Sequence, residues 1–194
     1  MPLYTLIHRY MHRDLFLRAL KKHGEAHDIP NISEQNAVFL RKLIFENNTK
    51  KLLEIWSANG YSTINFALEL EKTWWHITSI DFSQIAHEEA TENYKLAKVD
   101  HIISHYFWDA REIIPLLEET YDFVFIDGLK KESLNFLQII WDKTLPWGII
   151  VIDDVIKFRH KMESLYTYVE NNSLNYEVIQ IDSDDGIMII KKTK

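Results

Sequence analysis

Short apolar runs alternate with segments of helical periodicity through most of the chain. The apolar runs predict β-strands at residues 51–55, 76–80, 102–106, 122–126 and 149–152. The segments between them predict helices at residues 62–71, 83–98, 110–119 and 132–141. This alternation is typical of a parallel sheet with helices on both faces. Because crossovers in such sheets are right-handed, we expect the carboxyl ends of the strands to meet at one edge.

The N-terminal part of the chain has a helical pattern without strands. A helix is predicted from Leu3 to about His23, with Gly24 as its stop, followed by a connector that contains Pro30. Ser33 is a good N-cap for a second helix. The apolar face of this second helix is predicted at Val38, Phe39, Leu43 and Ile44.

The C-terminal part predicts a helix at residues 158–171 and two strands at residues 176–181 and 187–192. The turn at residues 183–186 reads Ser-Asp-Asp-Gly, which favours a hairpin that adds an antiparallel strand to the sheet. The predicted fold is therefore α/β, a Rossmann-like, doubly wound, mostly parallel sheet with a C-terminal antiparallel hairpin strand and N-terminal helices. We divide it into an N-terminal helical extension, residues 1–32, and a main domain, residues 33–194.

Composition narrows the classes of protein that fit. A chain of 194 residues with 46% hydrophobic residues can bury the core of one domain. The absence of cysteine excludes a disulfide framework, thiolate catalysis and cysteine-ligated metal sites, and it fits a reducing compartment. No apolar run approaches the roughly 20 residues that span a bilayer. The N-terminus does not resemble a signal peptide, so we expect a cytoplasmic protein without membrane contact.

The charge is unevenly distributed along the chain. A net charge of −7 argues against broad nucleic-acid binding. Residues 1–27 nevertheless carry a net charge of +3, because their five basic residues outnumber Asp14 and Glu25. The basic residues are Arg9, Arg13, Arg18, Lys21 and Lys22. They are either a solvated helix face or an arm that contacts the phosphates of a nucleic acid such as tRNA.

Each predicted strand of the parallel sheet ends at or near a carboxylate. These acidic residues are Glu54, Asp81, Asp109, Asp127 and the pair Asp153-Asp154. Ligands of open α/β sheets bind at this edge. Asp81 follows Gly60 at about the spacing of 20 residues that is expected for a carboxylate that binds ribose hydroxyls, which favours an adenosine-type cofactor. A helix N-cap is the alternative for Asp81.

Asp127, Asp153 and Asp154 follow two strands that we expect to be neighbours. Carboxylates so close raise one another's pKa unless a cation neutralises them, and oxygen ligands suit Mg²⁺ or a similar divalent ion. Lys130 could reach the same place, where a metal and desolvation would lower its pKa towards that of a general base. The alternatives are solvated carboxylates and a surface lysine.

The segments that hold these acids resemble three motifs of one family, the metal-dependent class I S-adenosylmethionine O-methyltransferases, which includes catechol and caffeoyl-CoA enzymes and their bacterial relatives. The sequence at residues 53–63, LEIWSANGYST, is similar to its first motif. The sequence at residues 121–130, YDFVFIDGLK, is similar to its metal-and-base motif, and that at residues 145–155, LPWGIIVIDDV, to the motif with the remaining metal ligands. Weaker matches lie at residues 109–115 and 185–188.

The resemblance implies a methyltransferase domain at residues 33–194 and a role for each matched position. The methionine moiety of the cofactor would be held by Glu54, Ser57, Asn59, Gly60, Tyr61 and Ser62, the ribose by Asp81, and the adenine edge by Asp109 and Ala110. Asp127, Asp153 and Asp154 would bind Mg²⁺ or another divalent ion, with Asp127 also near the cofactor. Lys130 would be the general base for a small, catechol-like hydroxyl acceptor. Family members that dimerise make a homodimer possible.

The sequence departs from the family at several positions. Trp56 replaces the first glycine of the cofactor turn, so its indole would either block the cofactor, as in a non-catalytic member, or line the rim. Asp154 stands where the family commonly has Asn, and Trp147 where it commonly has Gly. The segment after Val155, where the family has an acceptor-binding loop, is short. A tRNA-modifying enzyme of the same fold is a further alternative.

Overall fold

A computed structural model describes residues 3–71, 75–183 and 185–193, with side chains described from residue 13 onward. Its centre is a seven-stranded sheet with the order β3-β2-β1-β4-β5-β7-β6. The strands are β1 (Lys51–Ile55), β2 (His76–Asp81), β3 (Ile103–Phe107), β4 (Tyr121–Ile126), β5 (Thr144–Ile152), β6 (Tyr176–Gln180) and β7 (Gly186–Lys191). β1 to β5 pair in parallel, and β7 pairs antiparallel with both β5 and β6. The predicted fold class, including the hairpin, is confirmed.

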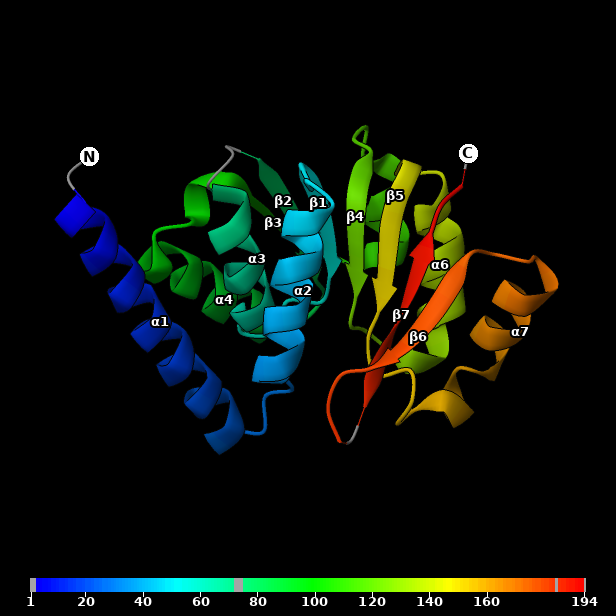
Figure 1. Ribbon diagram of the computed structural model, residues 1–194, viewed down its shortest axis with the longest axis horizontal. Coiled ribbons are helices and arrows are strands. Elements are labelled where there is room, and N and C mark those ends of the chain that lie inside the picture. Colours follow the sequence, from blue (N-terminus) through cyan, green and yellow to red (C-terminus); the bar gives the residue numbers. More distant parts are fainter. Residues whose placement is uncertain (1–2, 72–74, 184, 194) are drawn as a thin grey trace.

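Helices cover both faces of the sheet. The core on one face joins residues of α1 (Leu3–Ala26), α2 (Glu34–Glu46), α3 (Tyr61–Leu70) and α4 (Gln84–Ala97) to the sheet. The core on the other face joins α5 (Ala110–Ile113), α6 (Ser133–Trp141) and α7 (Glu163–Asn171) to it. In Figure 1 the strand arrows of β4 and β5 point downwards, towards the end of α1, the start of α2 and the β6–β7 connection. Segments that are far apart in sequence therefore meet at the carboxyl edge.

The first two helices differ in detail from the prediction. α1 continues through Gly24 to Ala26, and the left-handed residue that follows it is Asp28, with φ 55°. A Cβ on Gly24 would lie 2.2 Å from the side chain of Asn31, so this glycine permits a close approach of the connector and does not stop the helix. Ser33 caps α2 as predicted. Val38, predicted on the apolar face of α2, is instead 67% exposed.

Two later helices are shorter than their patterns predict. The predicted helix at residues 110–119 ends at Ile113 and continues as the 3-10 helix η3 (Ile114–Leu116). Pro115 explains this because it has no N–H for the helix ladder. The helix predicted at residues 158–171 begins later, as α7 at Glu163. A short 3-10 helix, η5 (Arg159–Lys161), precedes it. Among the described residues, no helix is long and apolar enough to cross a membrane.

Arg13 fixes α1 to the rest of the fold. Its guanidinium pairs with Glu71 and donates to the carbonyl oxygens of Ala97, at 2.9 Å, and Lys98, at 3.0 Å. Only 5% of Arg13 is exposed. Arg13 is thus not available to contact phosphate, which removes one charge from the basic arm that the sequence suggests. Arg9 lies outside the described side chains.

Replacement of Arg13 by Ala should destabilise the protein by about 3 kcal/mol, because it removes a buried guanidinium that pairs with Glu71 and donates to two carbonyl oxygens. Urea denaturation measures this change in the free energy of unfolding. Arg18→Ala, at an exposed position of the same helix, is the matched control and should change it little. Equal effects of the two substitutions would contradict the anchoring role of Arg13.

Candidate active site

The carboxylate of Glu54 lies beneath the turn that follows β1. Glu54 is fully buried, and its oxygens accept hydrogen bonds from the hydroxyls of Ser62 (2.5 Å), Thr63 and Ser79 (2.9 Å). Burial raises the pKa of Glu54 to about 7, although the three hydroxyls act against this. Glu54 and Ser62 thus bind each other and hold the start of α3 on β1. Their proposed contact with a cofactor stays a prediction.

Asp81 holds the other side of the same turn. Its carboxylate accepts hydrogen bonds from the backbone N–H groups of Ser57 (3.2 Å), Ala58 (3.0 Å) and Ser83 (2.8 Å). Burial raises its pKa, and these N–H groups oppose that change. Since an ionised carboxylate offers about four acceptor positions, Asp81 retains capacity for a ribose hydroxyl. Asp81 lines the cleft described below.

The rest of the turn is closely packed. Gly60 has φ 86°, and a Cβ there would lie 2.6 Å from the ring of Tyr94, so only glycine fits. Asn59 is fully buried, with its Oδ1 accepting the N–H of Tyr61 at 3.2 Å. The hydroxyl of Ser57 lies 3.1 Å from Nε2 of His105, a half-buried histidine whose pKa desolvation lowers to about 3. The turn is therefore preorganised in the folded protein.

Asp127, Asp153 and Asp154 meet beyond the ends of β4 and β5. Each offers an oxygen, and these three atoms all lie within 4.8 Å of one another. Burial raises the pKa of Asp127, and it raises that of Asp153 further, with the neighbouring carboxylates adding to the effect. The prediction that these carboxylates lie together is confirmed.

Lys130 contacts two members of this trio. Its ammonium lies 2.8 Å from Oδ1 of Asp127 and 2.8 Å from Oδ2 of Asp154. Burial disfavours its charge, but the two carboxylates outweigh burial and raise the pKa of Lys130. The lowering that the sequence predicts depends on a metal ion at these carboxylates, and it stays a prediction. It would require a second cation that takes over both carboxylates.

Two further side chains next to the trio bear on whether it fits a divalent ion. Asn36, buried on α2, donates from Nδ2 to Asp153 at 2.8 Å. Within the described part of the chain, its Oδ1 and the buried Oδ2 of Asp185 accept no hydrogen bond. Burial and the nearby Asp154 raise the pKa of Asp185. Mg²⁺ keeps several waters, and those waters would donate to such acceptors, so the residues present fit a hydrated Mg²⁺.

Two cavities meet at the trio. The larger, a cleft of about 750 Å³, is bounded by the β1 turn, the start of α4 and the end of α1. The smaller, of about 310 Å³, lies among the connector, the start of α2 and the β6–β7 connection. Asp127 and Asp154 line both cavities. A ligand in one cavity can therefore meet a ligand in the other beside these carboxylates.

Trp56 lies in the wall of the larger cleft. Its φ is 78°, a left-handed conformation that costs an L-residue on the order of 1 kcal/mol. The indole packs on Gly128, where an added Cβ would come within 3.0 Å of the ring. Its ring centroid lies 5.0 Å from that of Phe82. The cleft of about 750 Å³ is the space that remains with the indole in this position.

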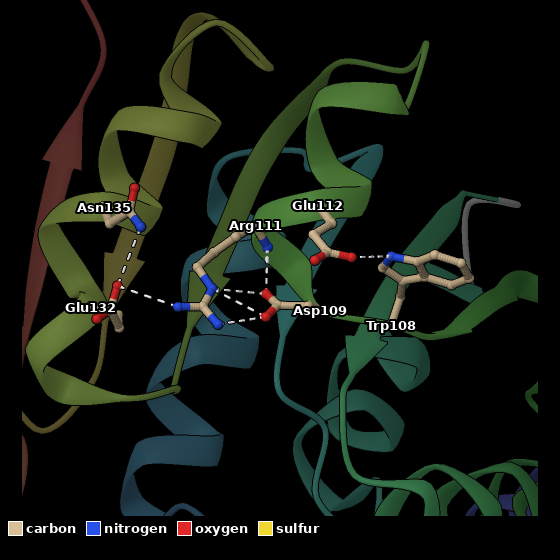
Figure 2. A network of polar contacts seen from close by, with 6 residues as sticks. All are labelled: Trp108, Asp109, Arg111, Glu112, Glu132 and Asn135. Atoms are coloured by element: carbon tan, nitrogen blue, oxygen red, sulfur yellow. Dashed lines mark hydrogen bonds and ion pairs between the residues drawn. The ribbon is translucent and has the colours of Figure 1, made fainter.

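Asp109, which the resemblance assigns to the adenine edge of the cofactor, contacts Arg111 in the structure. Its carboxylate caps α5 and pairs with the guanidinium of Arg111 at 2.6 Å, which lowers the pKa of Asp109 (Figure 2). The same guanidinium lies 3.8 Å from Glu132 in the 3-10 helix η4 (Lys130–Glu132), so Arg111 links α5 to the segment that carries Lys130. Asp109 and Ala110 are not among the residues that line the cleft. Their contact with a cofactor stays a prediction.

Sequence reasoning missed several residues that line the two cavities. The sequence did contain a signal for Phe82, because this aromatic residue directly follows Asp81, the acid that ends a strand. Asp185 lies in a weak motif match, but its proximity to Asp154 depends on the pairing of β5 with β7. His23 and Asn36 come from helices whose pattern carries no sign of the site, because only tertiary packing brings them to the edge.

The raised pKa of Glu54 predicts a pH-dependent stability that Glu54→Gln should remove. Between pH 4.5 and about 7 the folded protein keeps a proton that the unfolded chain releases. The free energy of unfolding therefore falls as pH rises through this window, by on the order of 3 kcal/mol, and this contribution is constant above it. Urea denaturation from pH 4.5 to 8 should show the variant gaining stability relative to the unaltered protein. Parallel profiles would rule out a buried, protonated Glu54.

Comparison with known proteins agrees with this geometry. A family model described as O-methyltransferase matches residues 8–192. Tapetum-specific methyltransferase 1 of Arabidopsis thaliana is 30% identical over 200 residues, covering 93% of this chain and 85% of that protein. Caffeoyl-CoA O-methyltransferase of Medicago sativa is 29% identical over 140 residues, covering 66% of this chain and 54% of that protein.

Among solved structures, the O-methyltransferase TomG of Streptomyces achromogenes, in complex with S-adenosylmethionine, superposes with a TM-score of 0.84. It is 20% identical, with 92% of this chain and 90% of that chain covered, so it supports the fold. The family model includes the β1 turn, the carboxylate trio and Lys130 within its range. These matches confirm the resemblance that the motifs indicate, and the chain belongs to the O-methyltransferase family.

Proposed function

We propose that this protein transfers a methyl group from S-adenosylmethionine to a hydroxyl of a small, catechol-like acceptor that is bound to Mg²⁺ or a similar divalent ion. The observation that carries the proposal is the trio Asp127, Asp153 and Asp154, with oxygens within 4.8 Å of one another where two cavities meet. Membership of the O-methyltransferase family supports the reaction type. The complex of TomG with S-adenosylmethionine supports the methyl donor.

The larger cleft suits the methyl donor. At about 750 Å³ it lies within the usual range for cofactor sites. Asp81 would accept hydrogen bonds from ribose hydroxyls, and the preorganised β1 turn lies beside it. Asp127 lines the same cleft, where its carboxylate would face the positively charged end of the donor. These residues would orient the donor so that its methyl group points towards the smaller cavity.

The smaller cavity suits the acceptor. Pro30, Ile32 and Phe158 give it apolar walls for a ring, and the trio also lines it. A caffeoyl-CoA O-methyltransferase is among the relatives, which favours an acceptor with two adjacent hydroxyls. Its volume of about 310 Å³ favours a compact acceptor or only the aromatic end of a larger one.

The reaction would move the methyl group from sulfur to oxygen while the hydroxyl loses its proton. The bound ion would supply Lewis acidity that favours the ionised hydroxyl. Lys130 would take that proton at Nζ once its two carboxylates are neutralised by the ion, because they hold its pKa high. Burial of Lys130 then favours the neutral amine. The residues of the two cavities would hold the reacting atoms in line.

Asp127→Asn should abolish metal-dependent methyl transfer while the fold is retained, because it removes a charged ligand shared by both cavities. Formation of S-adenosylhomocysteine from S-adenosylmethionine, Mg²⁺ and caffeate or caffeoyl-CoA measures the activity. The control is Asp100→Asn, at an exposed acid, which should retain it. Unchanged turnover in Asp127→Asn, or turnover that chelation of metal does not reduce, would contradict the metal assignment.

Lys130→Met should reduce kcat by roughly 10²- to 10⁴-fold, the usual contribution of a general base. Lys131→Met removes the exposed neighbouring lysine and is the matched control. Calorimetry with S-adenosylhomocysteine should find similar affinities in both variants. If the two variants turn over at the same rate, Lys130 is not the base.

A further inference from the structure

The turn that follows β1 has left-handed backbone at three of its residues. They are Trp56, Ala58 and Gly60, with φ of 78°, 46° and 86°. Glycine adopts this conformation freely, but a residue with a side chain adopts it only at a steric cost. Contacts from outside the turn must therefore hold Trp56 and Ala58 in this form. Ser57, between these two residues, is buried and makes such contacts.

Ser57 is held by both of the strands that follow β1 in sequence. Its backbone N–H donates to Oδ2 of Asp81, at the end of β2, at 3.2 Å. Its hydroxyl lies 3.1 Å from Nε2 of His105 in β3. Ser57 is not among the residues that line either cavity, whereas Trp56 and Ala58 line the larger cleft. The side chain of Ser57 thus anchors the turn, and the residues on either side of it form part of the cleft wall.

The contacts of His105 assign the position of its ring proton. The hydroxyl of Thr91 on α4 donates to the backbone carbonyl oxygen of His87 at 2.7 Å. Because this uses the one proton of Thr91, its oxygen accepts from Nδ1 of His105 at 3.1 Å. A neutral imidazole with its proton on Nδ1 has an unprotonated Nε2, which can only accept. The hydroxyl of Ser57 is therefore the donor to Nε2.

The surroundings of His105 keep its ring neutral. The ring is half-buried and stacks on that of His87, with centroids 4.0 Å apart. The ring of Tyr94 meets it edge-on at 5.2 Å. Desolvation lowers the pKa of His105 to about 3, and His87 adds to this effect. Near neutral pH, Nε2 therefore retains the lone pair that accepts from Ser57.

We propose that His105 is a positioning residue for the methyl donor and acts through the hydroxyl of Ser57. The inference rests on the proposed function, because it requires S-adenosylmethionine in the larger cleft. With Ser57 held by β2 and β3, Trp56 and Ala58 keep the strained backbone that shapes the cleft wall. Without the hydrogen bond to His105 this backbone would relax. The donor would then have to restore the turn as it binds, which weakens its binding.

A second serine–histidine pair joins β2 to β3 and provides a matched control. Nε2 of His76 lies 2.9 Å from the hydroxyl of Ser104, and both residues are half-buried. Because successive side chains of a strand point to opposite faces, Ser104 and His105 lie on opposite faces of the sheet. Neither His76 nor Ser104 is among the residues that line the two cavities. Loss of this pair therefore shows the effect of a purely structural hydrogen bond.

Calorimetry with S-adenosylhomocysteine tests the positioning role in two variants. His105→Phe keeps a flat ring without an acceptor, and Ser57→Ala removes the donor. Each should weaken binding by roughly 5- to 10-fold, as expected for the loss of one hydrogen bond. The double variant should bind no more weakly than either single variant, because both substitutions remove the same interaction. His105→Gln restores an acceptor and should recover most of the affinity.

Nitrogen-15 NMR of the histidine rings provides a readout that does not depend on ligand binding. Near neutral pH, His105 should carry its proton on Nδ1, and Nε2 should be unprotonated. The His105→Gln variant assigns the signals. A His105 ring protonated on Nε2 would overturn the proposal, because Ser57 would then not be its donor. Ser57→Ala removes only one oxygen, so the affinity test still applies if His105→Phe does not fold.

The controls His76→Phe and Ser104→Ala should lower the free energy of unfolding in urea without altering the affinity for S-adenosylhomocysteine. If His105→Phe and Ser57→Ala also change stability alone, their pair is structural and the proposal is overturned. A double variant whose loss of affinity is the sum of the two single losses would also overturn it, because His105 would not act through Ser57. If the unaltered protein binds no S-adenosylhomocysteine, the proposed function fails, and the positioning role fails with it.

Discussion

Negative charge gathered at one edge of the sheet is the constraint on which the rest of the site depends. The parallel register of β4 and β5 brings Asp127 and Asp153 together, and the turn after β5 adds Asp154. Carboxylates this close, one of them buried, cannot all remain ionised without positive charge. Lys130 supplies one cation, and Asn36 supplies a hydrogen bond to Asp153. Among the residues that the structure describes, acceptors of Asn36 and Asp185 accept no hydrogen bond, so they would suit the waters of a hydrated divalent ion.

Much of the fold and of the acidic edge could be predicted from the sequence. Strands of a sheet that helices cover on both faces are apolar along their length. Runs such as residues 123–126 can therefore be told from the amphipathic helices between them by their sequence pattern. Once the strands are parallel, right-handed crossovers bring Glu54, Asp81 and Asp127 to the same edge. The meeting of Asp127 with the pair Asp153-Asp154 follows from the pairing of β4 with β5. The assignment of Lys130 as a neighbour of these carboxylates also follows, because Lys130 is three residues from Asp127.

The remaining features depend on tertiary contacts that no local pattern records. Gly24 lies inside α1 and permits the close approach of Asn31, and the burial of Arg13 depends on Glu71 and the end of α4. Whether the pKa of Lys130 is raised or lowered from its usual value depends on which charged groups lie beside its ammonium. Sequence reasoning left open whether the indole of Trp56 fills the cofactor pocket or lines its rim. The structure places the ring against Gly128, far along the chain, a contact that no local pattern records.

The most direct test of the metal-centred account is a crystal structure with Mn²⁺ in place of Mg²⁺, with the ion located by its anomalous scattering. The account predicts one ion bound directly by Asp127, Asp153 and Asp154, with the ammonium of Lys130 moved off both of its carboxylates. Waters on that ion should donate to Asn36 and Asp185. A site without an ion at saturating Mn²⁺, with Lys130 still bridging Asp127 and Asp154, would contradict it.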